Sequence, residues 1–320
     1  MDKNKKLLLI SSILMFVYLL FCFCIIMITH EKVDILSIVL YSLYLIGACL
    51  FMYYSAGKGK VNRGLVFLFS IILFLGNIVS GVLGFVYHSK TSTYKKRELP
   101  KLEINHDYNK IVYILIFIVS MGLMFILPLF YDNRILNYSI EGLITLTLAY
   151  VFKNDLKRDF KYFKEYFREY SSYVFKMFLI AMAFMLILNI SIRTYTGLTE
   201  ATNQSDIRVA LTSYPILIII LAVFIAPFME ELLFRGIFRK VFNNKWVFIL
   251  TSGILFGVVH VIDDFKTPKE LLFILTYSAL GIFLGSVYHK TNNIYSNMFF
   301  HFIQNAFAMI VMILTTFLMK

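Results

Sequence analysis

The sequence predicts an all-α protein, a polytopic bundle of about eight to ten membrane-spanning helices. Its 320 residues are 59% hydrophobic and only 16% charged, whereas soluble domains are about 45–50% apolar and about 25% charged. Apolar runs of about 20 residues, long enough to span a bilayer as a helix, recur along the whole chain. The short alternating segments of a membrane β-barrel are missing from the sequence, so helices are expected to satisfy the backbone hydrogen bonds.

About ten apolar runs are candidate spans, and they differ in quality. The run 135–152 is the weakest because Asn137 and Glu141 lie near one end, and the runs 246–262 and 270–288 are short. Basic residues before the first run imitate a signal peptide, but its apolar stretch is too long and no small-residue cleavage site follows, so a retained helix is expected. The candidate spans are 7–29, 35–54, 65–87, 111–131, 135–152, 173–192, 214–238, 246–262, 270–288 and 294–319.

One segment divides the chain. Residues 153–172 place apolar side chains at steps of three and four, and lysine and arginine follow the adjacent face. This pattern predicts a basic amphipathic helix that lies in the membrane interface. We expect it to link an N-terminal membrane region of about five helices, residues 1–152, to a catalytic helical core, residues 173–320.

The charge balance indicates a lipid partner. The chain carries 31 Lys and Arg against 19 Asp and Glu, a net charge of +12. No nucleic-acid module accompanies this charge, so we expect basic loops at an anionic lipid surface and no nucleic acid as partner.

Three cysteines are too few for a disulfide scaffold or a four-thiolate zinc site. The residue usage is typical of an AT-rich bacterial genome, which predicts a multi-pass protein of a bacterial plasma membrane.

The first unusual feature of the C-terminal half is the sequence Glu-Glu-Leu-Leu-Phe-Arg near the end of an apolar run. Ionisable groups inside membrane helices are costly and therefore candidates for function. Glu231 and Arg235 are one helical turn apart and are expected to pair. Glu230 lies about 100° away on the helix wheel without a partner in its own segment, which suits a general base. Pro227 removes a backbone bond just upstream. The alternative is that Glu231 and Arg235 form a salt bridge at the membrane interface, beside one glutamate whose side chain snorkels to the membrane surface.

A second feature pairs an aromatic ring with a histidine. Phe256 and His260 lie one turn apart in an otherwise apolar segment. Gly253 and Gly257 form a stripe of small residues that allows another helix to approach closely. A hydrogen-bonded packing histidine is the alternative to a functional one.

The third feature lies in the last apolar run. His301 and Asn305 are again four residues apart and present two hydrogen-bond donors, which could stabilise negative charge on a substrate oxygen. Hydrogen bonding between helices is the alternative. Gly281 and Gly285 add another close-packing stripe. A glutamate, a histidine and a His/Asn pair on three separate helices are what water activation and oxyanion stabilisation require, so we expect an intramembrane cavity in the C-terminal half.

The order of these motifs resembles the CAAX protease and bacteriocin-processing family, also called the Abi family, which is related to the type II CAAX prenyl endopeptidase. The resemblance covers roughly residues 173–319, and the three motifs in this order are strongly specific. The family pattern is Glu-Glu-x-x-x-Arg, then Phe-x-x-x-His, then His-x-x-x-Asn. It is matched here by Glu230, Glu231, Arg235, Phe256, His260, His301 and Asn305.

The resemblance implies a glutamate-type intramembrane endopeptidase that works without a metal or another cofactor. Glu230 and His260 would activate water, and His301 with Asn305 would form the oxyanion hole. Bacterial members are linked to bacteriocin immunity, peptide maturation and surface-protein display, which implies a membrane-embedded or membrane-associated protein or peptide as substrate. The remaining motif residues would have supporting roles: Glu231, Arg235 and Phe256.

Three other functions stay open at the level of sequence. The first is a non-proteolytic membrane regulator or scaffold that binds a sensor kinase or a secretion or cell-envelope component. The second is a zinc protease with Glu230, His260 and His301 as ligands, although no His-Glu-x-x-His helix is present. The third is a transporter, which would be expected to show interrupted helices in matching positions of two halves.

Overall fold

The computed structural model contains helices and loops, with no strand among the residues that it describes, and this confirms the all-α fold class. The chain forms two compact units, Met1–Lys95 and Lys96–Lys320. The functional domain boundaries expected at residues 152 and 172 stay a prediction. The described residues are 5–29, 46–55, 63–76, 78–90, 97–130, 134–262 and 265–318.

The first unit is a small helical bundle. Its described helices are α1 (Lys5–Thr29), a helix over Ile46–Ser55, α3 (Arg63–Gly76) and α4 (Ile78–Lys90). Helix α4 packs against both α1 and α3. The Ser11 hydroxyl donates to the Ser80 carbonyl at 2.6 Å, so a buried polar bond joins α1 to α4. The candidate span 35–54 lies partly outside the described residues.

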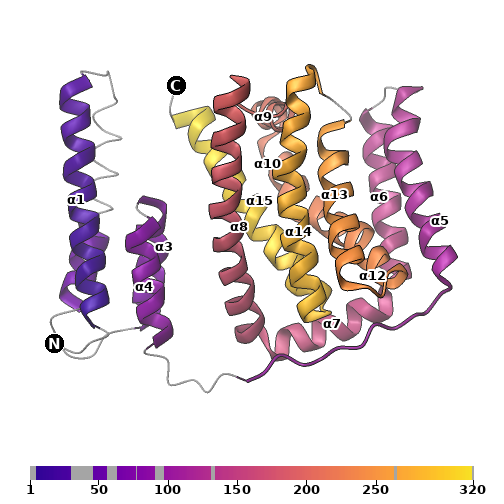
Figure 1. The fold of residues 1–320 in the computed structure, drawn as a ribbon, viewed down its shortest axis with the longest axis horizontal. Coiled ribbons are helices and arrows are strands. Elements are labelled where there is room, and N and C mark those ends of the chain that lie inside the picture. Colours follow the sequence, from indigo (N-terminus) through magenta and orange to yellow (C-terminus); the bar gives the residue numbers. More distant parts are fainter. Residues whose placement is uncertain are drawn as a thin grey trace. The chain divides into compact units, whose positions relative to one another are not determined.

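The second unit is a bundle of long apolar helices (Figure 1). Among the described residues, six helices are long and apolar enough to cross a membrane. The first three are Lys110–Leu129, which comprises α5 (Lys110–Met121), η1 (Gly122–Ile126) and η2 (Leu127–Leu129), then α8 (Phe167–Thr196) and the segment Pro215–Val241. The other three are α13 (Lys245–Ile262), then Pro268–Thr291, which comprises η5 (Pro268–Leu272) and α14 (Phe273–Thr291), and Ile294–Thr316, which comprises α15 (Ile294–Ile313) and the start of η6 (Leu314–Leu318). The predicted polytopic bundle is therefore confirmed. Helix α6 (Arg134–Val151), which carries Glu141, is not among the six.

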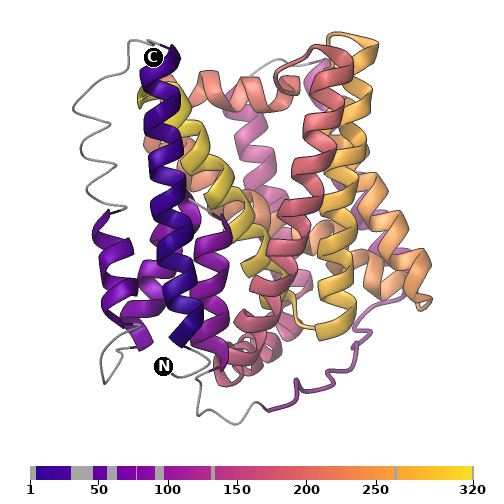
Figure 2. The ribbon, with the colours of Figure 1, turned by 60° about the vertical axis from the view of Figure 1, so that its left-hand side comes forward.

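Two shorter helices cross opposite ends of this unit. Helix α7 (Lys153–Glu165) runs across one end and α9 (Thr202–Ser213) across the other, as Figures 1 and 2 both show. Figure 2 also shows α15 running diagonally, at an angle to α14. The tilt of α15 means that residues along its length meet different neighbouring helices.

The segment Pro215–Val241, called the interrupted helix below, is one continuous helix whose α-helical winding is interrupted by wider turns. Two of its turns are π-helical, a wider winding that is common at functional sites. Its parts are α10 (Pro215–Ile220), η3 (Leu221–Ile225), α11 (Ala226–Glu230), η4 (Glu231–Gly236) and α12 (Ile237–Val241). The two adjacent glutamates, Glu230 and Glu231, therefore lie where α11 meets η4.

Glycines bring α13 and α14 into backbone contact. A Cβ atom on Gly253 would lie 2.7 Å from the backbone nitrogen of Ile282, and one on Gly281 would lie 2.6 Å from the carbonyl oxygen of Gly253. A Cβ atom on Gly257 would lie 2.5 Å from the backbone nitrogen of Ser278. Real Cβ atoms do not approach so closely, so only glycine fits, and the close packing predicted from these stripes is confirmed.

Helix α7 turns acidic residues toward the bundle. Phe160 is 54% exposed, which suits a helix in the membrane interface, whereas Asp155 and Asp159 are buried. Asp155 binds the Lys240 ammonium group at 2.5 Å, and Asp159 accepts the backbone N–H of Ile294 at 2.8 Å, at the start of α15. Burial raises the pKa of Asp159 to about 6 in spite of the neighbouring Arg158. The helical pattern of 153–172 did not predict these inward-facing carboxylates.

Candidate active site

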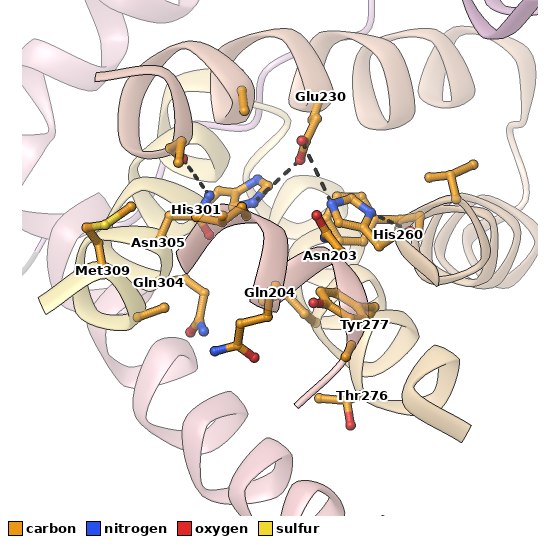
Figure 3. A pocket seen from close by; sticks show the side chains of 18 of the residues that line it. Asn203, Gln204, Glu230, His260, Thr276, Tyr277, His301, Gln304, Asn305 and Met309 are labelled. Carbon is orange, nitrogen blue, oxygen red and sulfur yellow. Dashed lines mark hydrogen bonds and ion pairs between the residues drawn. The ribbon is translucent and has the colours of Figure 1, made fainter. Parts of the chain in front are cut away.

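A cavity of about 670 Å³ lies within the second unit (Figure 3). Its walls are mostly apolar and come from α5 with η1, α6, α8, α9, the interrupted helix, α13, α14 and α15. Phe256 also contributes to its wall, whereas Glu231 and Arg235 do not. All four residues predicted to be catalytic line the cavity: Glu230, His260, His301 and Asn305.

Glu230 lies where the three sequence motifs meet. Its Oε1 atom is 3.8 Å from Nε2 of His260, and its Oε2 atom is 3.7 Å from Nε2 of His301. Both separations exceed a direct hydrogen bond. In the described part of the chain, Oε2 of Glu230 has no hydrogen-bond partner. The carboxylate therefore faces the cavity between two imidazoles and retains capacity to accept a proton.

The imidazole of His260 is fixed by its own helix and by α14. Its Nδ1 atom lies 2.8 Å from the Phe256 carbonyl oxygen, which can only accept, so Nδ1 carries the proton. Tyr277 stacks on the ring with a centroid distance of 5.1 Å. In the neutral ring this leaves the Nε2 lone pair directed toward Glu230. The glycine contacts between α13 and α14 explain why Tyr277 can approach so closely.

The imidazole of His301 is held by the second glutamate. Its Nδ1 atom lies 2.7 Å from Oε1 of Glu231, and both side chains are almost completely buried. Asn297, one turn earlier on α15, donates to the other oxygen of the same carboxylate. Nε2 of His301 is therefore left to face Glu230. The two adjacent glutamates have different environments because one points into the cavity and the other into the packed bundle.

Arg235 closes the cluster behind the cavity. It donates to Oε1 of Glu231 at 3.1 Å, which confirms the pairing expected from the four-residue spacing. It also donates to the Gly281 carbonyl at 3.1 Å and lies 4.5 Å from the centre of the Phe256 ring. The guanidinium is completely buried. One cation therefore connects the three segments that carry Glu230, His260 and Tyr277.

Pro227 explains the position of Asn305. In the π-helical turn η3, each N–H group bonds a carbonyl five residues earlier, as Ala226 does to Leu221. Pro227 has no N–H, so the next carbonyl, that of Ala222, loses its partner. The Asn305 amide donates to this carbonyl at 2.9 Å. Only one of its two N–H groups is used there, so Asn305 lines the cavity with a second donor available.

Sequence reasoning missed three residues at this site. Asn297 had a usable signal, because polar residues recur at every fourth position from the N-cap of α15 onward, at Asn293, Asn297, His301 and Asn305. Tyr277 had none, because one tyrosine is inconspicuous in a chain that is 17% aromatic. Gln304 lies within the third motif region but received no role. It lines the cavity and is 7% exposed.

Comparison with known proteins places the site within a recognised domain. Residues 212–307 match the family model described as Type II CAAX prenyl endopeptidase Rce1-like. The UPF0177 protein YvdC of Lactococcus lactis is 29% identical over 64% of this chain and 78% of its own length. The "Putative membrane peptidase YdiL" of Bacillus subtilis is 29% identical over 35% of this chain and 43% of its own length. The UPF0177 protein YxdF of Lactococcus lactis is 34% identical over 35% of this chain and 59% of its own length. No solved structure matches the chain significantly.

Fold and relatives together define a multi-pass protein of a bacterial plasma membrane. The matched domain begins before the interrupted helix and ends after Asn305, so it contains all three motifs. The family model over residues 212–307 and these relatives support membership of the CAAX protease and bacteriocin-processing family. The resemblance recognised from the motifs is thereby confirmed, whereas the roles of individual residues stay predictions.

Proposed function

We propose that this protein is a metal-independent endopeptidase that cleaves membrane-embedded or membrane-associated proteins or peptides inside the cavity of the second unit. The observation that carries the proposal is the position of Glu230 between His260 and His301, 3.8 and 3.7 Å from their Nε2 atoms. A carboxylate and an imidazole lone pair at this separation can hold one water molecule between them. Family membership supports peptide-bond hydrolysis as the reaction.

The proposed reaction begins with this water molecule. Glu230 accepts one of its protons while Nε2 of His260 accepts a hydrogen bond from the other, which directs the oxygen lone pair at the scissile carbonyl. The new C–O bond forms and the carbonyl becomes an oxyanion. Glu230 then gives its proton to the amide nitrogen, the C–N bond breaks, and an acid and an amine are released. No atom other than those of water and substrate is consumed.

His301 and Asn305 are proposed to stabilise the oxyanion. Nδ1 of His301 is engaged by Glu231, so His301 is proposed to donate from Nε2 as an imidazolium ion. The two carboxylates of Glu230 and Glu231 together balance this charge and that of Arg235. The second amide N–H of Asn305 is the other donor, and its bond to Ala222 fixes its position. Two preorganised donors of this kind stabilise a tetrahedral intermediate in acyl transfer.

The supporting motif residues are proposed to orient the catalytic ones. Glu231 and Arg235 hold His301, and Phe256 contributes both a ring beneath Arg235 and the carbonyl that fixes the His260 tautomer. A zinc site gains no support from the geometry, because among the described residues no group of three or more His, Cys, Asp or Glu side chains could hold a metal ion. The substrates are proposed to serve bacteriocin immunity, peptide maturation or surface-protein display.

The proposal is tested by cleavage of membrane-segment peptides with the purified protein in vesicles. Glu230→Gln keeps the shape of the side chain but removes the base, so kcat should fall at least about 100-fold. Glu141→Gln is the matched control, because Glu141 also lines the cavity and interacts electrostatically with Glu230. We expect it to change kcat only a few-fold. Equal loss in both variants, or none in Glu230→Gln, would contradict the assignment of Glu230.

A further inference from the structure

Gln304 is a buried polar residue that the proposed reaction does not use. It is 7% exposed, lies on α15 between His301 and Asn305, and lines the cavity. Across the residues described by the structure, its Oε1 atom has no hydrogen-bond partner. A buried amide oxygen without a partner costs about 1–3 kcal/mol. Such a group is expected to find its partner in a ligand.

Gln204 of α9 lines the same cavity and is half-buried. Figure 3 shows the side chains of Gln204 and Gln304 reaching into the same part of the cavity, away from Glu230. The surrounding walls are mostly apolar. Each primary amide offers two N–H donors and one carbonyl acceptor. That combination matches one chemical group above all, the main-chain peptide unit, which presents one donor and one acceptor.

We propose that Gln304, together with Gln204, forms a subsite that hydrogen-bonds a main-chain peptide group of the substrate beside the scissile bond. The ligand is an extended polypeptide segment, recognised by its backbone rather than by its side chains. This inference rests on the proposed peptidase function for the identity of the bond that is cut. It adds a binding site that the three motifs do not contain.

Helix geometry places this subsite at a useful distance from the chemistry. Gln304 follows His301 by three residues, which is about 4.5 Å along a helix axis. An extended chain advances about 3.3 Å per residue. A substrate whose scissile carbonyl lies beside His301 therefore presents its first or second neighbouring peptide group to Gln304.

The membrane setting gives such a subsite a physical purpose. A helix must be locally unwound before its peptide bond can be attacked, and unwinding frees N–H and C=O groups. Without water, each freed group costs several kcal/mol. Amide side chains on an otherwise apolar wall can replace the lost helical bonds and stabilise the unwound segment.

The test measures peptide binding in the full chain carrying Glu230→Gln, so that no cleavage intervenes. The probe is a fluorescent apolar peptide of about 20 leucine and alanine residues, with lysine at each end and Asn-Gly at its centre to loosen the helix. A second set of probes carries one N-methyl group at successive central peptide nitrogens, which removes a single main-chain donor each time. Dissociation constants are measured in detergent micelles.

Three substitutions are compared in this background. Gln304→Met keeps the length of the side chain and removes its hydrogen bonding. Thr145→Val is the matched control, because Thr145 lines the same cavity but its hydroxyl already donates to the Glu141 carbonyl at 2.7 Å. Gln204→Met removes the hydrogen-bonding groups of the second proposed subsite residue, which is more exposed than Gln304, and it serves as the test if Gln304→Met does not fold.

The subsite predicts one specific pattern. With Gln304 present, one methylated peptide should bind about tenfold more weakly than its parent, the equivalent of one hydrogen bond. With Gln304→Met, the parent itself should bind about tenfold more weakly, and methylation at that position should cost nothing further. Thr145→Val should behave as its Glu230→Gln background, and Gln204→Met should weaken binding of the parent peptide.

Other results would overturn the subsite. These are a methylation cost that is equal with and without Gln304, or no binding of the parent peptide to the Glu230→Gln chain. Cleavage by the chain with Glu230 intact is measured separately. Gln304-dependent binding without cleavage would contradict the proposed function alone, whereas cleavage with Gln304-independent binding would contradict the subsite alone.

Discussion

The second unit contains two clusters of buried charge that look alike in composition and differ in how completely they are bonded. At the α7 end, all four carboxylate oxygens of Asp155 and Asp159 have partners, supplied by Arg158, Lys240 and the Ile294 N–H. At the cavity, Glu231 is equally saturated, but Oε2 of Glu230 has no hydrogen-bond partner among the described residues, and His301 Nε2 lies 3.7 Å from it, beyond the 3.1 Å of the longest aspartate contact. Burial alone therefore does not mark a reactive group. The reactive group is distinguished by a carboxylate oxygen, Oε2 of Glu230, that still lacks a hydrogen-bond partner among the described residues.

This difference assigns separate tasks to the two clusters. A saturated carboxylate takes up a proton only by losing a bond that it already makes, and neither Asp155 nor Asp159 lines the cavity. The α7 cluster is accordingly expected to affect stability and leave catalysis unchanged. The cavity cluster contains both kinds of residue, so its supporting members should affect both properties.

The largest stability effect is expected for Arg235→Met. Removing one partner of a buried ion pair costs about 3–5 kcal/mol, because the remaining charge is left uncompensated. Glu231 would be that charge, and His301 would lose its fixed orientation, so cleavage should also fall. Denaturant unfolding in detergent and the cleavage rate per folded molecule measure the two effects.

The double variant Arg235→Met with Glu231→Leu provides the control for this substitution. It removes both charges and should recover much of the stability, as apolar replacements of buried pairs commonly do. Cleavage should not return, because His301 still lacks its carboxylate. Recovery of cleavage in the double variant would show that the pair does not orient His301.

A somewhat smaller effect is expected for Lys240→Met at the α7 end. Asp155 would lose the ammonium group at 2.5 Å but keep Arg158 at 3.1 Å, so we expect a loss of about 2–3 kcal/mol in the free energy of unfolding. The cleavage rate per folded molecule should match the unchanged chain. A selective loss of kcat without a loss of stability would contradict the separation of the two clusters.

The pH dependence of stability gives a third comparison. The pKa of Asp159 is raised to about 6 by burial, above its value of about 3.9 in an unfolded chain. The folded state therefore prefers the protonated form. Its contribution to stability is full below about pH 4 and is lost as the pH rises through 6, by about 2–3 kcal/mol in total. Asp159→Asn should remove this dependence.

The measurement is the free energy of unfolding of both chains between pH 4 and pH 7. The stability of the unchanged chain relative to Asp159→Asn should decline across this interval. A difference that stays constant would show that Arg158 cancels the effect of burial on the Asp159 pKa, and one that grows as the pH rises would show that Arg158 outweighs burial. Subtracting the variant cancels the titration of other groups.

Much of the fold followed from the sequence because the physics there is local. Apolar run length fixes whether a helix can span a bilayer, and the four-residue spacing of Glu231 and Arg235 fixes a pair on one helix. The glycine stripes of α13 and α14 also predicted a contact that needs only small side chains. These properties depend on few residues close together in the chain.

The rest depends on how helices rotate and tilt against one another. Asn305 bonds Ala222 because Pro227, far away in the sequence, leaves a carbonyl free. Asp155 faces the bundle because it pairs with Lys240, a residue 85 positions further along the chain. Tyr277 meets His260 only because α13 and α14 touch. No periodicity within a single segment contains this information.

A non-proteolytic role as a membrane regulator or scaffold is one of the alternatives that the sequence left open. Genetic complementation distinguishes it from the proposed peptidase. If the protein acts only by binding, Glu230→Gln and His260→Ala should each complement a deletion strain fully. If it acts by cleavage, neither should complement, while Lys240→Met should do so in proportion to the folded protein present. Membrane and surface proteomics of the same strains would identify uncut substrates.

The role of Glu230 as the base is tested most directly by the cleavage rate per folded molecule of Glu230→Gln and Lys240→Met, measured side by side in vesicles. Glu230→Gln should unfold like the unchanged chain yet lose at least about 100-fold in kcat, whereas Lys240→Met should be less stable yet cleave at the unchanged rate. A Glu230→Gln protein that cleaves as fast as the unchanged chain would contradict the role of Glu230 as the base.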